Sequence, residues 1–166
     1  MNDLTRQSQF IEPGYIYITP VPTVLYAVVG TCVAVTVWDR VRRIGGMNHF
    51  LYPKTSDPDR STAQYGNVSV STLLRMMENA GSRLEHLEAQ LFGGAALFFN
   101  SRNDVGAQNV AAARHILHKR KIRIVSEDIG GIRGRKIAFD NRSGHVIIHK
   151  VQRLRQGDWH FRQSAL

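Results

Sequence analysis

The segment VAVTVWDRVRRIGGMNHFL, residues 33–51, decides the fold that we expect for this chain. Its first part, 33–38, is rich in β-branched residues, and its last part, 44–51, is again mainly apolar. Polar and basic residues at 39–43 separate the two parts. Two apolar runs joined by a short polar segment are typical of a β-hairpin, so we expect two antiparallel strands with a turn at about residues 40–41.

Further strands and two helices are expected on both sides of this hairpin. Because strands outnumber helices and do not alternate strictly with them, the pattern indicates an α+β fold. A long loop is expected at 53–65, where two prolines and many turn-forming residues occur. The first helix is expected to be capped by Ser69 or Ser71 and the second by Asn103 or Asp104. Further strands are expected at 15–18, 24–29, 92–100, 122–125, 137–139 and 146–151, with residues 84–91 leading into the strand at 92–100. Helices are expected at 69–80 and 104–119.

The composition is that of an ordinary globular domain. Of the 166 residues, 43% are apolar and 21% are charged, and this length suits one domain. Cys32 is the only cysteine, which excludes an internal disulfide and a multi-cysteine metal site. Residues 1–9 are polar, unlike a signal peptide, and the apolar run at 24–37 is too short to span a bilayer. We therefore expect a cytoplasmic protein without membrane insertion.

The formal net charge of +9 lies entirely in the last third of the chain. Residues 1–110 carry nine basic and nine acidic residues, whereas residues 111–166 carry thirteen basic and four acidic residues. Such a surface favours an acidic partner, although a solvated basic face is an equally simple interpretation. The run HKRK at 118–121 has no accompanying aromatic platform or zinc-finger spacing, so we expect no nucleic-acid partner.

The clearest chemical signal is the spacing between Cys32 and His49. With a turn at 40–41, these two residues stand directly opposite each other, with Cβ atoms about 5 Å apart. His49 could then lower the pKa of the Cys32 thiol for nucleophilic attack, and backbone N–H groups around Gly30 and Thr31 could bind an oxyanion. A lone cysteine among valines is more often a small core residue, and the spacing leaves both interpretations open.

Other polar groups have a structural and a functional interpretation. Asn48 could bind substrate or could complete a strand edge. The glycine pairs at 93–94 and 130–131 could shape a substrate groove or could form tight turns. The histidine pairs at 115 and 118 and at 145 and 149 have no cysteine or acidic residue at ligand spacing, so we expect no metal site.

Several short motifs, taken together, resemble a known family. The chain reads GTCVAV at 30–35, GGMNHFLYP at 45–53, YG at 65–66, LFGGA at 91–95, VGAQNV at 105–110, DIGG at 128–131, GRKI at 134–137 and GHV at 144–146. In this order they resemble the chemoreceptor glutamine deamidases of bacterial chemotaxis, the CheD family. The resemblance implies one CheD-like domain over 1–166, with a core at about 15–151. It also implies packed mixed β-sheets flanked by helices, of the cysteine-hydrolase type.

The resemblance also implies roles for the two chemical residues. Cys32 corresponds to the family's nucleophile and His49 to its base, acting through a thioester on glutamine side chains of methyl-accepting chemotaxis receptors. No cofactor is implied, and a CheC-type phosphatase is an implied partner. The family usually has a threonine six residues before the cysteine, where this chain has Tyr26, so Tyr26, Thr23 or Thr31 could supply a third hydroxyl. A catalytically weak module that binds receptor or CheC is the alternative that this departure favours.

Overall fold

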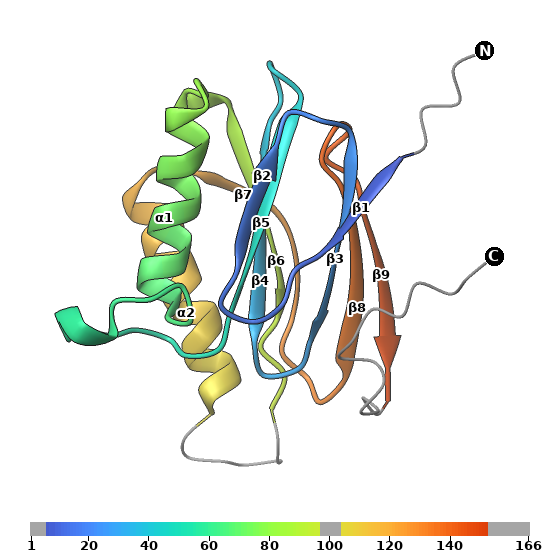
Figure 1. Cartoon of the computed structure of the whole chain (residues 1–166). Helices are drawn as coiled ribbons and strands as arrows, with labels where there is room; N and C mark the ends of the chain where they lie inside the picture. Colours follow the sequence, from blue (N-terminus) through green and yellow to red (C-terminus); the bar gives the residue numbers. More distant parts are fainter. Residues whose placement is uncertain (1–5, 97–103, 153–166) are drawn as a thin grey trace.

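The computed structural model describes residues 6–96 and 104–152, which form two β-sheets and two α-helices in three layers (Figure 1). The helices cover one face of a five-stranded sheet, and a four-stranded sheet covers its other face. The five-stranded sheet has the order β2 (Ile16–Thr19), β5 (Ile44–Phe50), β4 (Val33–Asp39), β6 (Leu87–Gly93) and β7 (Arg123–Ile129). The four-stranded sheet has the order β1 (Gln7–Phe10), β3 (Thr23–Val29), β8 (Gly134–Asp140) and β9 (Val146–Val151).

This arrangement confirms the expected fold of packed mixed sheets with helices, with both helices on one side. Antiparallel pairs predominate, and β1 pairs in parallel with β3 and β6 with β7. The helix α2 (Val105–Lys119) connects the parallel neighbours β6 and β7, and α1 (Gly66–Asn79) packs beside it. Single-turn 3₁₀ helices occur at Pro58–Arg60 and Leu84–His86. No helix among the described residues is long and apolar enough to cross a membrane.

Strand β4 is central because both of its faces are buried. Val33, Val35 and Val37 point into the core between the five-stranded sheet and the helices. Ala34 points into a second core between the two sheets, with Leu25 of β3 among its neighbours there. A strand that is buried on both faces reads as a continuous apolar run, which is the physical reason for the sequence VAVTVW.

The hairpin of β4 and β5 is confirmed, but its expected register is wrong by two residues. Ala34 lies opposite His49, whereas the sequence analysis placed Cys32 there. The cause is the turn, because the Asp39 carboxylate accepts hydrogen bonds from the backbone N–H groups of Val41 and Arg42. These bonds extend β4 to Asp39, and the four-residue connection ends at Arg43, which has a positive φ of 56°.

The first helix begins earlier than expected and without the expected cap. Helix α1 starts at Gly66, its N-cap Tyr65 makes no side-chain capping bond, and the expected caps Ser69 and Ser71 lie inside the helix. Backbone carbonyls of the preceding loop replace the cap, since Gly66 N–H donates to the Tyr52 carbonyl (2.8 Å). In α2, the expected cap Asp104 is confirmed by its bond from Ala107 N–H (3.0 Å).

Strand β6 also differs from the expectation of a strand at 92–100. It covers Leu87–Gly93, ends at the glycine pair, and residues 97–100 lie outside the described residues. Gly93 has a φ of +110°, and a Cβ atom there would lie 2.1 Å from the Cys32 carbonyl oxygen. Gly94 follows with a φ of +66°. The pair therefore ends the strand and allows it to approach the backbone of Cys32 closely.

Candidate active site around Cys32 and His49

Cys32 lies in a bend between β3 and β4, in the core between the two sheets. Its side chain is 7% exposed and belongs to the inter-sheet cluster that contains Ala34 and Phe92. Two backbone bonds from the end of β6 hold this bend, with Gly94 N–H donating to the Cys32 carbonyl and Ala95 N–H to the Gly30 carbonyl, both at 2.9 Å. The bend therefore has a defined position although it lies outside any strand.

His49 lies on β5 and is fully buried. Its Nδ1 lies 2.9 Å from the backbone carbonyl oxygen of Ile11. Because a carbonyl can only accept a hydrogen bond, Nδ1 carries the proton and Nε2 has a lone pair available. Among the described residues, Nε2 has no hydrogen-bond partner. Burial lowers the pKa of His49 to about 4, against the opposing effect of the Ile11 carbonyl, so the imidazole is neutral at pH 7.

The thiol and the imidazole lie on the same face of the five-stranded sheet. Ala34 and His49 are opposed across β4 and β5, and opposed residues share a face. Cys32 precedes Ala34 by two residues and shares its cluster, so Cys32 is the diagonal neighbour of His49. Diagonal neighbours have Cα atoms about 7–8 Å apart, which is within reach of longer side chains. The Cys32 thiol makes no hydrogen bond to Nε2 in this structure.

Burial raises the pKa of the Cys32 thiol above its ordinary value. The backbone N–H groups of Cys32 and Gly30 and the hydroxyl of Thr31 act in the opposite direction, because each donates toward a thiolate. In the resting protein both Cys32 and His49 are therefore uncharged. The site has a neutral thiol and a neutral imidazole, with donors already arranged for the negative charge that deprotonation would create.

The candidates for a third hydroxyl lie in different places. On β3, Leu25 and Ala27 point into the inter-sheet core, so Tyr26 points to the opposite face of its sheet. Tyr26 contributes its backbone instead, since its carbonyl accepts from Ile11 N–H (2.7 Å). The hydroxyl of Thr23 donates to the Val21 carbonyl, within the β2–β3 connection. Of the candidates, Thr31 has its hydroxyl next to Cys32.

Asn48 lies on the other face of β5 from His49. It is opposed to Val35, whose side chain packs under the helices, and the Asn48 carboxamide oxygen accepts from Val35 N–H (2.8 Å). Asn48 is fully buried. The strand geometry therefore separates Asn48 from the thiol and the imidazole. Its hydrogen bond with Val35 instead stabilises the β4–β5 hairpin.

Two groups at the site were missed by the sequence analysis. Ile11 acts through its backbone carbonyl, and a backbone group leaves no signal in the side-chain pattern. Asn109 of α2 donates to backbone carbonyls of the segments that carry Cys32 and His49. Its motif VGAQNV was noted as part of the resemblance, so a signal existed for this residue, but nothing in the pattern pointed to its contacts.

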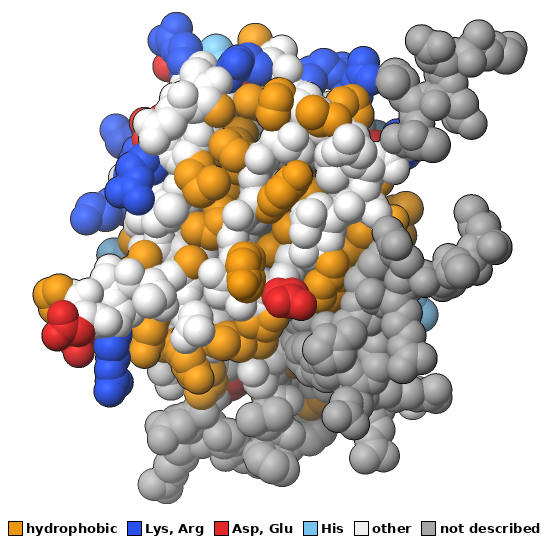
Figure 2. Space-filling model, in the orientation of Figure 1, with side chains coloured by type: hydrophobic (Ala, Val, Ile, Leu, Met, Phe, Trp, Pro, Cys, Tyr) orange, Lys and Arg blue, Asp and Glu red, His pale blue; other side chains and the backbone are white. Residues whose placement is uncertain are grey.

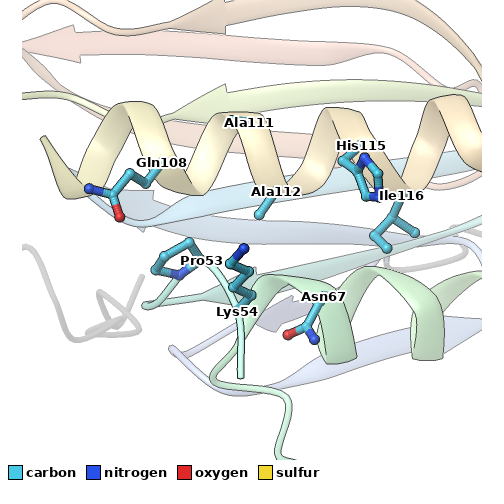
Figure 3. Close-up of a pocket in the computed structure, with 8 residues that line it drawn as sticks. All are labelled: Pro53, Lys54, Asn67, Gln108, Ala111, Ala112, His115 and Ile116. Atoms are coloured by element: carbon cyan, nitrogen blue, oxygen red, sulfur yellow. The ribbon is translucent and has the colours of Figure 1, made fainter. Parts of the chain in front are cut away.

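A separate hollow of about 600 Å³ lies on the helical side of the molecule (Figure 3). Gln108, His115 and Ile116 of α2 face Pro53, Lys54 and Asn67 across it. Cys32 and His49 are on the other side of the five-stranded sheet and do not line this hollow. His115 lies there without a ligand set, and no group of three His, Cys, Asp or Glu residues is placed to hold a metal ion within 6–96 and 104–152.

A buried thiol and imidazole on one face of a sheet define a candidate cysteine-nucleophile site, and comparison with known proteins assigns the family. The family model described as CheD chemotactic sensory transduction matches residues 51–150. A protein of Sulfurimonas denitrificans named "Probable chemoreceptor glutamine deamidase CheD" is 38% identical over 150 residues, covering 89% of this chain and 96% of its own. The chain belongs to the CheD family.

Further relatives agree with this assignment. A protein of the same name from Thiobacillus denitrificans is 37% identical, covering 87% of this chain and 74% of its own. A protein of Anaeromyxobacter dehalogenans named "Probable chemoreceptor glutamine deamidase CheD 1" is 38% identical, covering 88% of this chain and 86% of its own.

Among solved structures, a Neisseria meningitidis protein of the family model DUF152 aligns at a TM-score of 0.43 and 12% identity, over 76% of this chain and 63% of its own. A likeness at this level adds nothing to the family assignment.

Proposed function

We propose that this protein is a hydrolase that deamidates glutamine side chains of chemotaxis receptors, converting them to glutamates. The observation that carries the proposal is the position of Cys32 and His49 on one inter-sheet face, in a chain that belongs to the CheD family. Support also comes from relatives named as chemoreceptor glutamine deamidases that match over most of their length.

With substrate bound, the thiol proton of Cys32 passes to Nε2 of His49 as the sulfur attacks. Sγ attacks the amide carbon of the glutamine side chain, and the tetrahedral intermediate collapses when the imidazolium gives its proton to the departing ammonia. The resulting thioester is attacked by water, whose proton passes to Nε2. Collapse of the second intermediate releases the glutamate side chain and restores the thiol. One water is consumed and one ammonia is formed for each glutamine.

The low pKa of His49 favours proton donation to the leaving ammonia and opposes proton uptake from the thiol. With a pKa of about 4, an imidazolium at His49 is a strong proton donor, which favours protonation of the leaving ammonia. The same low pKa makes proton transfer from the thiol unfavourable at rest. The N–H groups of Gly30 and Cys32 and the Thr31 hydroxyl offset this cost by stabilising negative charge on Sγ. We propose that productive thiolate forms as substrate is attacked and not beforehand.

The orientation of the base is assigned here to the Ile11 carbonyl. In a cysteine–histidine mechanism, a third group holds the imidazole in one tautomer and stabilises its charged form. The Ile11 carbonyl oxygen at 2.9 Å from Nδ1 meets both requirements. The Tyr26 side chain then has no part in orienting the base. Thr31 instead acts at the nucleophile, Cys32.

Receptor recognition is proposed to use exposed aromatic residues beside the strand that carries His49. Tyr15 is 63% exposed and its carbonyl accepts from His49 N–H, and Tyr52 is 47% exposed, three residues after His49. Figure 2 shows hydrophobic side chains across the middle of one face of the molecule, with an acidic side chain beside them, and basic side chains along the top and upper left. An apolar surface bordered on part of its edge by basic residues fits an amphipathic receptor helix with acidic side chains. We place the reaction in the cytoplasm, with a CheC-type phosphatase as a further partner.

Ammonia release and mass spectrometry of a receptor cytoplasmic fragment test the proposal. The wild type is expected to convert glutamine to glutamate, and Cys32→Ala and His49→Gln are expected to convert none. His49→Gln keeps a donor for Ile11 and so separates the chemistry from the fold. Binding of the fragment by all three proteins, with no conversion by any, would favour the alternative of a receptor- or CheC-binding module. The observation that favours this alternative is Nε2 without a bond to the thiol.

A further inference from the structure

We propose that Asn109 is a positioning residue that sets the distance between the thiol of Cys32 and the imidazole of His49. The inference rests on the proposed function, and it concerns a residue of α2 that touches neither reacting group. Asn109 is fully buried, and its side-chain amide makes two hydrogen bonds. Nδ2 donates to the Thr31 carbonyl at 2.9 Å and to the Leu51 carbonyl at 3.0 Å.

These two carbonyls belong to the two segments that carry the reacting groups. Thr31 directly precedes Cys32, and Leu51 follows His49 by two residues. An amide NH₂ has two donor hydrogens, and Asn109 uses one on each segment. The side chain therefore bridges the cysteine bend and the end of β5 through a single nitrogen atom, and any change in its position moves both segments.

The bridge stands where the strand pairing ends. The last pair of β4 and β5 is Val33 with Phe50, so pairing between these strands does not extend to Cys32. Beyond this pair, Asn109 provides the connection between the two segments, in the place where a further pair of the ladder would lie. On the other side of the bend, Gly94 N–H donates to the Cys32 carbonyl. Cys32 is thus held between β6 and α2.

Glycines allow α2 to lie close enough for this contact. A Cβ atom on Gly106 would lie 2.4 Å from the Ala95 carbonyl oxygen and 2.5 Å from that of Gly94. A Cβ atom on Gly94 would lie 2.5 Å from a methyl carbon of Val110. The first turn of α2 therefore rests directly on the end of β6, and Asn109 is one turn further along, facing the bend.

Asn141 offers a matched control for a purely structural role. It is also buried, and its Nδ2 donates to the Thr19 carbonyl at 2.9 Å and the Val21 carbonyl at 3.0 Å. Its Oδ1 accepts from Thr23 N–H at 2.8 Å. Asn141 therefore makes the same kind of bridge between backbone carbonyls, but within the β2–β3 connection and not at the cysteine bend.

The test compares Asn109→Ala and Asn109→Ser with Asn141→Ala and Asn141→Ser in the full chain. Three quantities are measured: Tm, kcat and KM on a receptor fragment, and the pH profile of Cys32 alkylation by iodoacetamide. We expect both Asn109 variants to lower kcat by about tenfold to a hundredfold with little change in KM, since small misplacements of reacting groups have effects of this size. The alkylation profile should shift along the pH axis. The Asn141 variants should lose comparable Tm while keeping kcat and the profile of the wild type.

Equal effects of the Asn109 and Asn141 variants on kcat, with an unchanged alkylation profile, would overturn the proposal and leave Asn109 as a structural anchor. So would failure of both Asn109 variants to fold. The alkylation profile needs no receptor. If the wild type does not deamidate but the profile shifts in the Asn109 variants alone, then the proposed function fails while the positioning role stands.

Discussion

The His49 imidazole donates its Nδ1 hydrogen to the backbone carbonyl of Ile11 over 2.9 Å, and this bond determines the tautomer of the ring. Nε2 is left as the acceptor. A backbone carbonyl in this position cannot be removed by substitution of its own side chain, so the imidazole is held by the path of the chain between β1 and β2. The orientation of His49 is thus a property of the fold.

The pH dependence of stability should show the low pKa of His49. In the unfolded chain this histidine binds a proton near pH 6.5, whereas in the folded protein it does so only near pH 4. The stabilisation is therefore complete above pH 6.5 and is lost as the pH falls toward 4, by up to about 3 kcal/mol. Urea unfolding of wild type and His49→Gln between pH 4 and 7.5 measures this. Parallel curves for the two proteins would contradict the prediction.

Thr31→Val should make the cysteine less reactive. Loss of the hydroxyl removes one of the donors that lower the Cys32 pKa, so the alkylation profile is expected to move to higher pH and deamidation to slow by about tenfold. Because Cys32 is the only cysteine, whole-protein mass spectrometry reads its alkylation directly. An unchanged profile would remove Thr31 from the site.

Thr36→Val is the control for that substitution and carries its own prediction. The Thr36 hydroxyl is buried on β4 and has no hydrogen-bond partner among the described residues. Replacement by the similarly shaped valine should raise the free energy of unfolding by about 1 kcal/mol and leave the alkylation profile unchanged. A loss of stability would show that the hydroxyl has a partner.

Tyr26→Phe should keep deamidase activity within about twofold of the wild type, because the Ile11 carbonyl is the partner of Nδ1. Tyr26→Thr restores the residue usual in the family and is expected to give no gain. The measurement is kcat on a receptor fragment. A loss of tenfold or more in Tyr26→Phe would instead assign the Tyr26 hydroxyl to the mechanism.

Two Gly→Ala substitutions distinguish the cost of a steric clash in the packing from the cost of a positive φ in a turn. Gly106→Ala places a Cβ atom 2.4 Å from the Ala95 carbonyl oxygen, so it should cost about 3 kcal/mol and displace α2 from the cysteine bend. At Gly131 a Cβ atom meets nothing within 4 Å, and the positive φ of +65° alone should cost about 1 kcal/mol in Gly131→Ala. Thermal unfolding and kcat of both variants test this. Equal losses would contradict it.

Several elements could be predicted because their signals are local. Asp104 before a helical pattern defines the start of α2, and the apolar run at 33–38 followed by a polar segment defines the central hairpin. The register of that hairpin was wrong because the sequence analysis did not use a local signal, the Asp39 carboxylate, which accepts from the N–H groups of Val41 and Arg42. The start of α1 also escaped prediction, since backbone carbonyls at the beginning of the preceding loop replace its cap and leave no signal in the side-chain pattern.

The sequence by itself determined which residues can do chemistry. With one cysteine in the chain and His49 in the hairpin that follows it, residue type and motifs that resemble the CheD family point to the candidate nucleophile and the candidate base. Only the tertiary structure decided how they are arranged: diagonal and not directly opposed, both neutral, the base held by Ile11 and the bend bridged by Asn109. The reason is physical. Burial sets the pKa values, and the contacts that orient the pair come from backbone groups and from a helix far away in sequence, neither of which local sequence patterns encode.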